Sequence, residues 1–297
     1  MSGPVLVIAG PTAVGKTAAG ITYALRHGTE IISADSRQVY QYLDIGTAKP
    51  TAQERAQVKH HLVDFLDPAR AYSAAEYAAD ARRVMDALDS QGNPYIVVGG
   101  SGLYIRALIE GLAAIPSADD AIRAELAAFV KEHGKAALHQ RLTKIDPVTA
   151  GRLKPNDTVR ITRALEVHRL TGKPISQWHA NERVKDRREY RLVVLDMERE
   201  TLYERINQRV DAMLGAGLVD EVRGILAKGY SPALNALQTV GYKEVIAHLN
   251  GEYDAARMTE LIKQNTRNFA KRQLTWFRGM KNAEWLTPEQ LIKDIEA

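Results

Sequence analysis

The segment that most constrains this chain is GPTAVGKT, at residues 10–17. It follows a β-branched apolar run at residues 5–9 and precedes residues 16–26, where apolar side chains recur at helical spacing. The pattern G-x-x-x-x-G-K-[ST] between a strand and a helix predicts a phosphate-binding loop, called the phosphate loop below. A plain glycine turn is far less favoured. The diphosphate- or nucleotide-binding residues that we predict are Gly10, Pro11, Thr12, Ala13, Val14, Gly15, Lys16 and Thr17.

Two side chains of the phosphate loop would contact the ligand directly. Lys16 would reach the terminal phosphate, and the Thr17 hydroxyl would bind Mg²⁺, the single metal cofactor that the sequence supports. The motif alone would be labelled ATP-binding. It specifies a phosphate chain, however, and not the reaction carried out on it.

Strand and helix patterns alternate through the first third of the chain. Residues 30–36 read as a second strand, and residues 73–88 as an amphipathic helix with Ser73 as N-cap and Glu76 completing a capping box. Residues 93–108 read as a buried strand, a glycine turn and a helix. This alternation predicts an α/β fold, similar to a P-loop NTPase core, with a parallel sheet flanked by helices.

The pattern changes after Gly111. From residue 118 to about 180 the periodicity is helical, with prolines between the segments and no strand candidate. A strand returns at residues 191–197, and residues 199–297 read as helices that pack back on the core. We therefore expect residues 1–112 and 188–297 to form the α/β core, and residues 113–187 to form an all-helical insertion domain.

Asp35 follows the second predicted strand, at the sheet edge where α/β folds bind ligands. Three roles fit this position: binding Mg²⁺ through water, acting as a general base, or capping its own turn. The pattern by itself slightly favours the first role.

The sequence VVGGSGLY at residues 97–104 is rich in glycine and follows another buried strand. It indicates close approach of the backbone to a bulky group, with Ser101 as the polar residue there, although a simple crossover turn fits equally well. The neighbouring His60 and His61 would point to opposite faces of a strand. We expect them to pack or hydrogen-bond locally rather than to share a metal ion.

Basic side chains gather in two helical regions, although the net charge is only +4. Residues 263–278, KQNTRNFAKRQLTWFR, contain no acidic residue, and residues 156–172 in the predicted insertion hold a second cluster. A solvated basic face is the common fate of one such run. Because this chain has two such runs together with a phosphate loop, nucleic-acid binding is about as favoured as a solvated basic face.

Composition excludes several other classes. The chain has no cysteine, so it has no disulfide and no thiolate-bound metal. Its apolar runs fall short of membrane-spanning length, and the N-terminus lacks the pattern of a signal peptide. We expect a cytoplasmic protein without a membrane partner.

Together these motifs resemble one family closely, the tRNA dimethylallyltransferases, also called tRNA isopentenyltransferases. The matching segments follow the family's order: GPTAVGKT, DSRQVYQYLDIGTAKP, HHLVD, VGGSGLYIRAL, NDTVRITRALEV, TGKP, TVGYKE and TRNFAKRQLTWFR. DIGTAKP combined with AKRQLTWFR is far more specific than the phosphate loop. The departures are small: Val14 where serine is frequent, Arg37 where methionine is frequent, and Ser101 where threonine is frequent. Without cysteine for a zinc finger, the chain resembles the short bacterial form.

The resemblance implies transfer of a dimethylallyl group from dimethylallyl diphosphate to N6 of adenine 37, beside the tRNA anticodon. The phosphate loop and Mg²⁺ would hold the departing diphosphate, where donors aimed at developing charge lower the barrier. Asp35 then becomes the general base, because the N6 amine is a poor nucleophile that must lose a proton. Catalytic roles follow for Asp35, Ser101 and Arg209, although a surface position fits Arg209 equally well.

The resemblance also implies that the target adenine leaves its stack and that the core and the insertion hold the anticodon loop. The implied tRNA-binding residues are Asp35, Ser36, Arg37, Gln38, Ser101, Arg123, Val159, Arg160, Ile161, Thr162, Arg163, Gln238, Gly241, Lys243, Arg267, Lys271 and Arg272. Residues 266–273 would follow the RNA backbone.

Three alternatives stay open on the sequence. A small-molecule kinase shares the loop and the sheet, a prenyltransferase of free adenine nucleotides shares the chemistry, and an RNA-binding NTPase switch shares the basic helices. On the main hypothesis the partners are a tRNA anticodon stem-loop and dimethylallyl diphosphate, bound by a monomer.

Overall fold

The structure, a computed structural model, describes residues 3–113, 115–180 and 186–296. The chain divides into two compact units: a core made of Met1–Ile109 and Asp186–Ala297, and an insertion, Glu110–Lys185. These boundaries lie within a few residues of those expected from the sequence.

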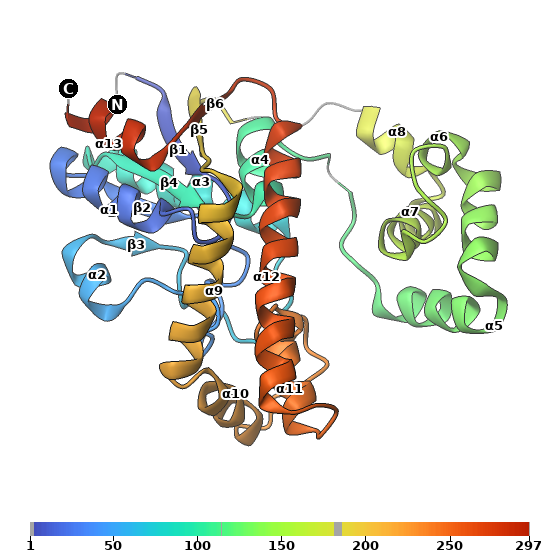
Figure 1. The fold of residues 1–297 in the computed structure, drawn as a ribbon. Helices are drawn as coiled ribbons and strands as arrows, with labels where there is room; N and C mark the ends of the chain where they lie inside the picture. Colours follow the sequence, from blue (N-terminus) through green and yellow to red (C-terminus); the bar gives the residue numbers. More distant parts are fainter. Residues whose placement is uncertain (1–2, 114, 181–185, 297) are drawn as a thin grey trace. The chain divides into compact units, whose positions relative to one another are not determined.

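A six-stranded parallel sheet forms the centre of the core (Figure 1). Its order is β3-β2-β4-β1-β5-β6, so the strand that leads into the phosphate loop lies in the interior, between β4 and β5. The strands are β1 (Val5–Ala9), β2 (Glu30–Ser33), β3 (His60–His61), β4 (Tyr95–Gly99), β5 (Tyr190–Leu195) and β6 (Ala283–Leu286).

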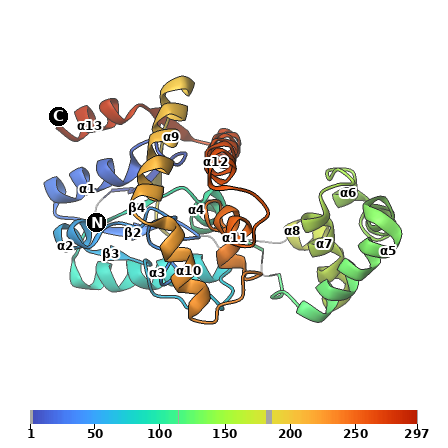
Figure 2. The same cartoon turned by 60° about the horizontal axis from the view of Figure 1, so that its bottom comes forward.

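Helices cover both faces of this sheet. Side chains alternate along a strand, and Leu6 and Ile8 of β1 pack in one hydrophobic cluster with Ile21, Leu202 and Leu291. These partners come from α1 (Lys16–His27), α9 (Arg199–Gly215) and α13 (Pro288–Glu296). On the other side lie α3 (Ala74–Gln91) and α4 (Gly102–Glu110), and Figure 2 shows α1 and α3 on opposite sides of the sheet. The predicted α/β fold is confirmed.

A second hydrophobic cluster in the core joins the loop after β2 to the C-terminal helices. Val39, Leu43, Leu218, Leu237 and Tyr242 are among its buried members. The helices involved are α10 (Leu218–Ala227), the 3₁₀ helix η1 (Asn235–Gln238), α11 (Tyr242–Leu249) and the long α12 (Ala255–Arg278), which packs along α9 (Figure 1). The short α2 (Ala52–Gln57) completes the core's helices as far as the structure describes them.

One local prediction from the sequence, the capping box of α3, is confirmed, and another, on the C-terminal region, is wrong. The Ser73 hydroxyl accepts the Glu76 N–H, and the Glu76 carboxylate accepts the Ser73 N–H, so the predicted capping box is confirmed. The expectation of helices throughout residues 199–297 is wrong at β6. This strand has four half-buried residues without a β-branched side chain, so pairing with β5, rather than local propensity, stabilises it.

The regular secondary structure described in the insertion is all helical, as expected. It contains α5 (Asp120–Ile145), α6 (Pro147–Ala150), α7 (Thr158–Thr171) and α8 (Ile175–Ala180), which bury a separate hydrophobic cluster. Gly134, at φ 82° and ψ 167°, interrupts α5 between its two halves. None of the helices described in either unit is long and apolar enough to cross a bilayer.

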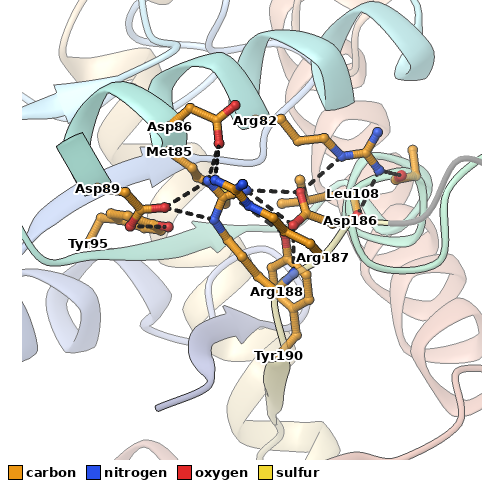
Figure 3. Close-up of polar contacts among 11 residues, drawn as sticks. Arg82, Met85, Asp86, Asp89, Tyr95, Leu108, Asp186, Arg187, Arg188 and Tyr190 are labelled. Atoms are coloured by element: carbon orange, nitrogen blue, oxygen red, sulfur yellow. Dashed lines mark hydrogen bonds and ion pairs between the residues drawn. The ribbon is translucent and has the colours of Figure 1, made fainter. Parts of the chain in front are cut away.

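An ionic cluster fixes the start of β5 to α3 (Figure 3). Arg188 donates to Asp89 at 2.8 Å, to Asp186 at 3.1 Å, and also to Asp86. The Asp186 side chain is only 1% exposed and accepts a second bond, at 3.1 Å, from Arg82. Burial opposes the charge on Arg188, but its carboxylate partners outweigh burial and raise its pKa. The strand that leads to the edge of the site is therefore anchored at its N-terminal end by paired charges.

Candidate active site

The phosphate loop curls between β1 and α1 because its glycines permit conformations that other residues avoid. Gly10 has φ 142°, and a Cβ there would lie 2.6 Å from the carbonyl oxygen of Leu195. Gly15 has φ 106° and occupies the N-cap position of α1 without a side chain to cap it. The N–H groups at the start of α1 are therefore open to an anion, as the motif predicted.

Lys16 lies within this loop, and burial and neighbouring charges both act on its ammonium group. Its Nζ donates a 2.6 Å hydrogen bond to the carbonyl of Pro11. Burial lowers the pKa of Lys16 to about 7, the positive charge of Arg209 adds to this effect, and the Asp35 carboxylate opposes it. The three residues predicted for the phosphate, the cation and the base are thus close enough to influence one another.

A first cavity of about 400 Å³ confirms this grouping. The residues that line it include Thr12, Lys16, Thr17, Asp35 and Arg209. Burial lowers the pKa of Arg209, and the Asp35 carboxylate opposes the effect. Arg209 is half-buried and lines the cavity, which favours the role at the site over that of an exposed surface arginine.

Asp35 both caps its turn and lines the cavity. Its Oδ1 accepts the backbone N–H groups of Arg37 at 2.8 Å and Gln38 at 3.3 Å. This is the capping role that the sequence had left open. It fixes the orientation of the carboxylate that the cavity contains.

The glycine turn after β4 holds the residues next to Asp35. Gly99 packs so tightly that a Cβ would lie 2.2 Å from the carbonyl oxygen of Ala34. Ser101 accepts a 2.8 Å bond from the Ser36 N–H and donates at 3.1 Å to the Ser36 hydroxyl. Ser101 therefore supports the turn that carries Asp35, and both Ser101 and that turn line the cavity.

Gln273 is a site residue that the sequence interpretation assigned wrongly. It was grouped with residues that follow RNA, but it is 7% exposed. Its amide oxygen accepts the Thr12 N–H at 2.9 Å, and its nitrogen donates to the Gly100 carbonyl at 2.9 Å. The sequence did contain a signal for this burial. Gln273 lies at helical spacing from Ala270 and Phe277, which are both buried, and so falls on the buried face of α12.

Four of the predicted tRNA-binding residues from the C-terminal helices also line the first cavity: Gln238, Gly241, Lys243 and Arg272. Arg37 lines it as well, and its guanidinium donates to the Asn235 carbonyl and side chain, both at 2.8 Å. Lys271 is exposed on α12. Arg267 is half-buried and donates to Asn207 of α9 at 2.6 Å, so part of its hydrogen-bonding capacity serves helix packing.

The predicted tRNA-binding residues of the insertion fall into two groups. Arg123 and Arg163 donate to the buried Glu166, at 2.8 Å and 2.5 Å. Val159 is 79% exposed, Arg160 is exposed and Thr162 is half-buried. The assignment of Ile161 to RNA contact is wrong for its side chain, which lies fully buried in the insertion's hydrophobic cluster.

A second cavity, of about 940 Å³, also has the loop lysine in its lining. Lys16, Thr17, Pro50, Arg209 and Met213 line both cavities. The second cavity also takes in the basic residues Arg205, Arg55 and Lys49. Residues of the phosphate loop therefore border both cavities.

The metal expected from the motif fits the donors that surround the loop. The described residues contain no group of three or more histidine, aspartate or glutamate side chains arranged as a metal site. Thr17 lines both cavities, and Asp35 lines the first. Mg²⁺ commonly takes a few protein oxygens and completes its shell with phosphate and water, so this set suits it only together with a diphosphate.

His60 and His61 form local hydrogen bonds, as expected. His60 Nδ1 lies 2.7 Å from the Val58 carbonyl, and His61 Nε2 lies 2.5 Å from Glu30. Burial lowers the pKa of His60. The pair does not converge on one point.

Comparisons with known proteins agree with the geometry. A family model described as IPP transferase matches residues 38–280. The chain belongs to the IPP transferase family. A tRNA dimethylallyltransferase of Geobacter metallireducens is 48% identical over 283 residues, which cover 95% of this chain and 91% of that relative.

Solved structures of the IPP transferase family share the fold. A tRNA isopentenylpyrophosphate transferase from Bacillus halodurans matches with a TM-score of 0.71 and 38% identity, over 99% of this chain and 94% of that one. A eukaryotic dimethylallyltransferase acting on tRNA matches with a TM-score of 0.78 and 28% identity, over 93% of this chain and 70% of that one. The resemblance inferred from the motifs is confirmed.

Proposed function

We propose that this chain transfers the dimethylallyl group of dimethylallyl diphosphate to N6 of adenosine 37, beside the anticodon of a tRNA. The observation that carries the proposal is the first cavity, where Asp35 shares a space with Lys16, Thr17 and Arg209. A carboxylate on one side and phosphate-binding groups on the other suit a reaction that removes a proton and releases a diphosphate. The names of the relatives, which act on tRNA, support the acceptor.

The reaction exchanges one bond for another at the allylic carbon. The carbon–oxygen bond breaks and its electron pair leaves with the diphosphate, while the N6 lone pair forms the new carbon–nitrogen bond. N6 then carries one proton too many, and the Asp35 carboxylate accepts it. The turn bonds from Arg37 and Gln38 hold this carboxylate in place.

The leaving diphosphate needs positive charge and N–H donors around it. The loop backbone, Lys16 and Arg209 supply them in a partly buried site, where such groups act more strongly than in water. When bound, Mg²⁺ at Thr17 would neutralise further charge on the diphosphate. Ser101 acts through the turn that carries Asp35.

The acceptor base must reach Asp35 from outside the core. Adenine in a stacked loop exposes N6 poorly, so we infer that the base leaves its stack and enters the first cavity. Gln38, Gln238, Lys243 and Arg272 line this cavity and offer polar contacts to the base and its neighbouring phosphates. Contacts from the insertion, through Arg160 above all, stay a prediction.

A kinase of small molecules is the second candidate on geometry alone, because a phosphate loop with a nearby carboxylate also suits phosphoryl transfer. Membership of the IPP transferase family argues against it. Cytoplasmic location and a monomeric state stay predictions.

The deciding experiment incubates the protein with labelled dimethylallyl diphosphate, Mg²⁺ and unmodified tRNA. We expect label in the RNA, at adenosine 37, and free diphosphate in equal amount. AMP and an anticodon stem-loop then serve as competing acceptors. An unlabelled tRNA would refute the proposal, and efficient labelling of AMP would favour a prenyltransferase of free nucleotides.

A further inference from the structure

The loop of residues 44–50, with the sequence DIGTAKP, is a wall shared by both cavities. Gly46, Thr47 and Pro50 of this loop line the first cavity. Asp44 and Ile45 are among the loop residues that line the second cavity. This shared wall lines the first cavity together with Asp35, Lys16 and Thr17, and the second together with Gly15, Lys16 and Thr17. A shift of its backbone changes the shape of both spaces.

One carboxylate from α10 holds this wall by its backbone. Glu221 accepts the consecutive N–H groups of Asp44 at 3.0 Å, Ile45 at 2.7 Å and Gly46 at 3.2 Å. Consecutive N–H groups that converge in a turn form a concave site for an anion. Here a protein carboxylate fills that site, so the shared wall is not a second phosphate loop.

A buried tyrosine fixes Glu221 in turn. The Tyr242 hydroxyl donates to Glu221 at 2.5 Å, and the Tyr242 side chain is fully buried. Burial and the neighbouring Glu221 charge raise the pKa of Tyr242, so its hydroxyl stays a donor. The ring packs against Gly46, where a Cβ would lie 2.4 Å from it. The carboxylate and the ring therefore both hold the wall at Gly46.

Lys49 holds the same turn from within. It is buried, and its Nζ donates to the Tyr40 carbonyl at 2.8 Å, to Asp44 at 2.5 Å and to Asp64 at 2.8 Å. The Lys49 N–H also bonds the Asp44 carbonyl at 3.0 Å. These bonds shape the turn, whereas Glu221 decides where the turn lies relative to α10.

We propose that Glu221 is a positioning residue for the prenyl donor: it touches no substrate and sets the wall beside the diphosphate and its allyl group. The inference rests on the proposed function. Its specific consequence is a change in donor affinity, because the displaced wall lines both cavities beside Lys16 and Thr17.

The test compares Glu221→Gln, Glu221→Ala and Tyr242→Phe with the wild type. Steady-state transfer gives kcat and KM for dimethylallyl diphosphate, calorimetry gives its Kd without RNA, and thermal melting gives the folded fraction. Loss of the charge-assisted bonds should raise donor KM and Kd about tenfold in Glu221→Ala and about threefold in the two milder variants. The Kd for an anticodon stem-loop should change less than the donor Kd, because the proposed RNA contacts Gln238, Lys243 and Arg272 lie outside the wall.

The matched control is Asp220→Asn, the preceding residue on α10, whose side chain is 77% exposed and pairs with Arg223. It should behave as the wild type. If activity in the Glu221 variants falls only with the folded fraction, at unchanged donor KM and Kd, Glu221 merely supports folding and the proposal is overturned. Absence of transfer by the wild type would instead refute the proposed function, so the two failures are distinct.

Discussion

The side-chain oxygen of Gln273 accepts a 2.9 Å hydrogen bond from the backbone N–H of Thr12, across 261 positions of sequence. The same amide donates to the Gly100 carbonyl at 2.9 Å. Through one buried side chain, α12 joins the phosphate loop to the glycine turn that supports Asp35. The groups expected to bind the leaving diphosphate and to accept the proton thus share a single link.

Gln273→Glu tests this link. The carboxylate can still accept the Thr12 N–H, but it faces the Gly100 carbonyl without a donor and adds negative charge near the diphosphate. We expect KM for dimethylallyl diphosphate to rise at least about tenfold, measured by steady-state transfer. Gln264→Glu, at an exposed position of the same helix, should leave KM unchanged. An equal KM in both variants would contradict the role of Gln273.

Asp35→Asn separates the proposed base from the turn cap. Asparagine keeps an oxygen that can accept the N–H groups of Arg37 and Gln38, so the turn should survive. Because the amide cannot take a proton, single-turnover transfer should fall by a factor of about 10² to 10⁴, with near-normal RNA binding. Asp67→Asn is the control, since Asp67 caps a similar exposed turn through Ala69. Full activity of Asp35→Asn would remove Asp35 as the base.

The lowered pKa of Lys16 predicts how binding of dimethylallyl diphosphate depends on pH. With its pKa lowered to about 7, the free protein loses the Lys16 charge as pH rises through neutrality. A bound diphosphate favours the charged form, so binding at pH 8 should take up a proton, whereas binding at pH 6 should take up almost none at this residue. Calorimetry in buffers of different ionisation enthalpy measures the uptake. Equal uptake at both pH values would contradict the lowered pKa.

Lys271→Ala tests whether α12 contacts RNA phosphates. Loss of one contact should weaken binding of an anticodon stem-loop and reduce the slope of log K against log salt by about one. Fluorescence anisotropy over a range of salt concentrations measures both quantities. Lys293→Ala, at an exposed position on α13, should keep the wild-type slope. If Lys271→Ala keeps it too, this face of α12 is merely solvated.

Arg188→Met tests the ionic cluster at the start of β5. It leaves the buried Asp186 with one partner fewer, so the free energy of unfolding should fall by about 2–4 kcal/mol in urea titrations at pH 7. Although burial acts against it, the Arg188 partner lowers the pKa of Asp89. That stabilisation is present above the unfolded-state pKa of about 3.9 and is lost as pH falls through the lower folded-state value.

The difference between the wild type and Arg188→Met should therefore shrink at pH 3. Arg187→Met is the control. The Arg187 side chain is 78% exposed, and its 3.4 Å ion pair with Asp86 is therefore weak. This substitution should cost at most about 0.5 kcal/mol. A pH-independent difference for Arg188→Met would show that its packing, and not its charge, stabilises the strand.

Local patterns were enough for much of this molecule. Residues 10–17 carry their loop conformation in their own glycines, and the alternation of strands and helices predicted a parallel sheet covered by helices. Helical periodicity without a strand pattern also located the insertion. These features depend on neighbours in sequence, where backbone sterics and side-chain spacing act directly. Ile161 shows where local patterns fail. It belongs to the same basic segment as Arg160 and Arg163, but its side chain is buried in the insertion's hydrophobic cluster.

By itself, the sequence determined the phosphate loop, the α/β core, the helical insertion and, through its motifs, the family. Only the tertiary structure decided that Arg209 faces Asp35 and Lys16, that Gln273 bonds Thr12 rather than RNA, and that Glu221 fills the turn of the shared wall. Each of these contacts joins segments far apart in the chain. Which distant groups meet depends on how the helices pack around the sheet, and no local spacing encodes that.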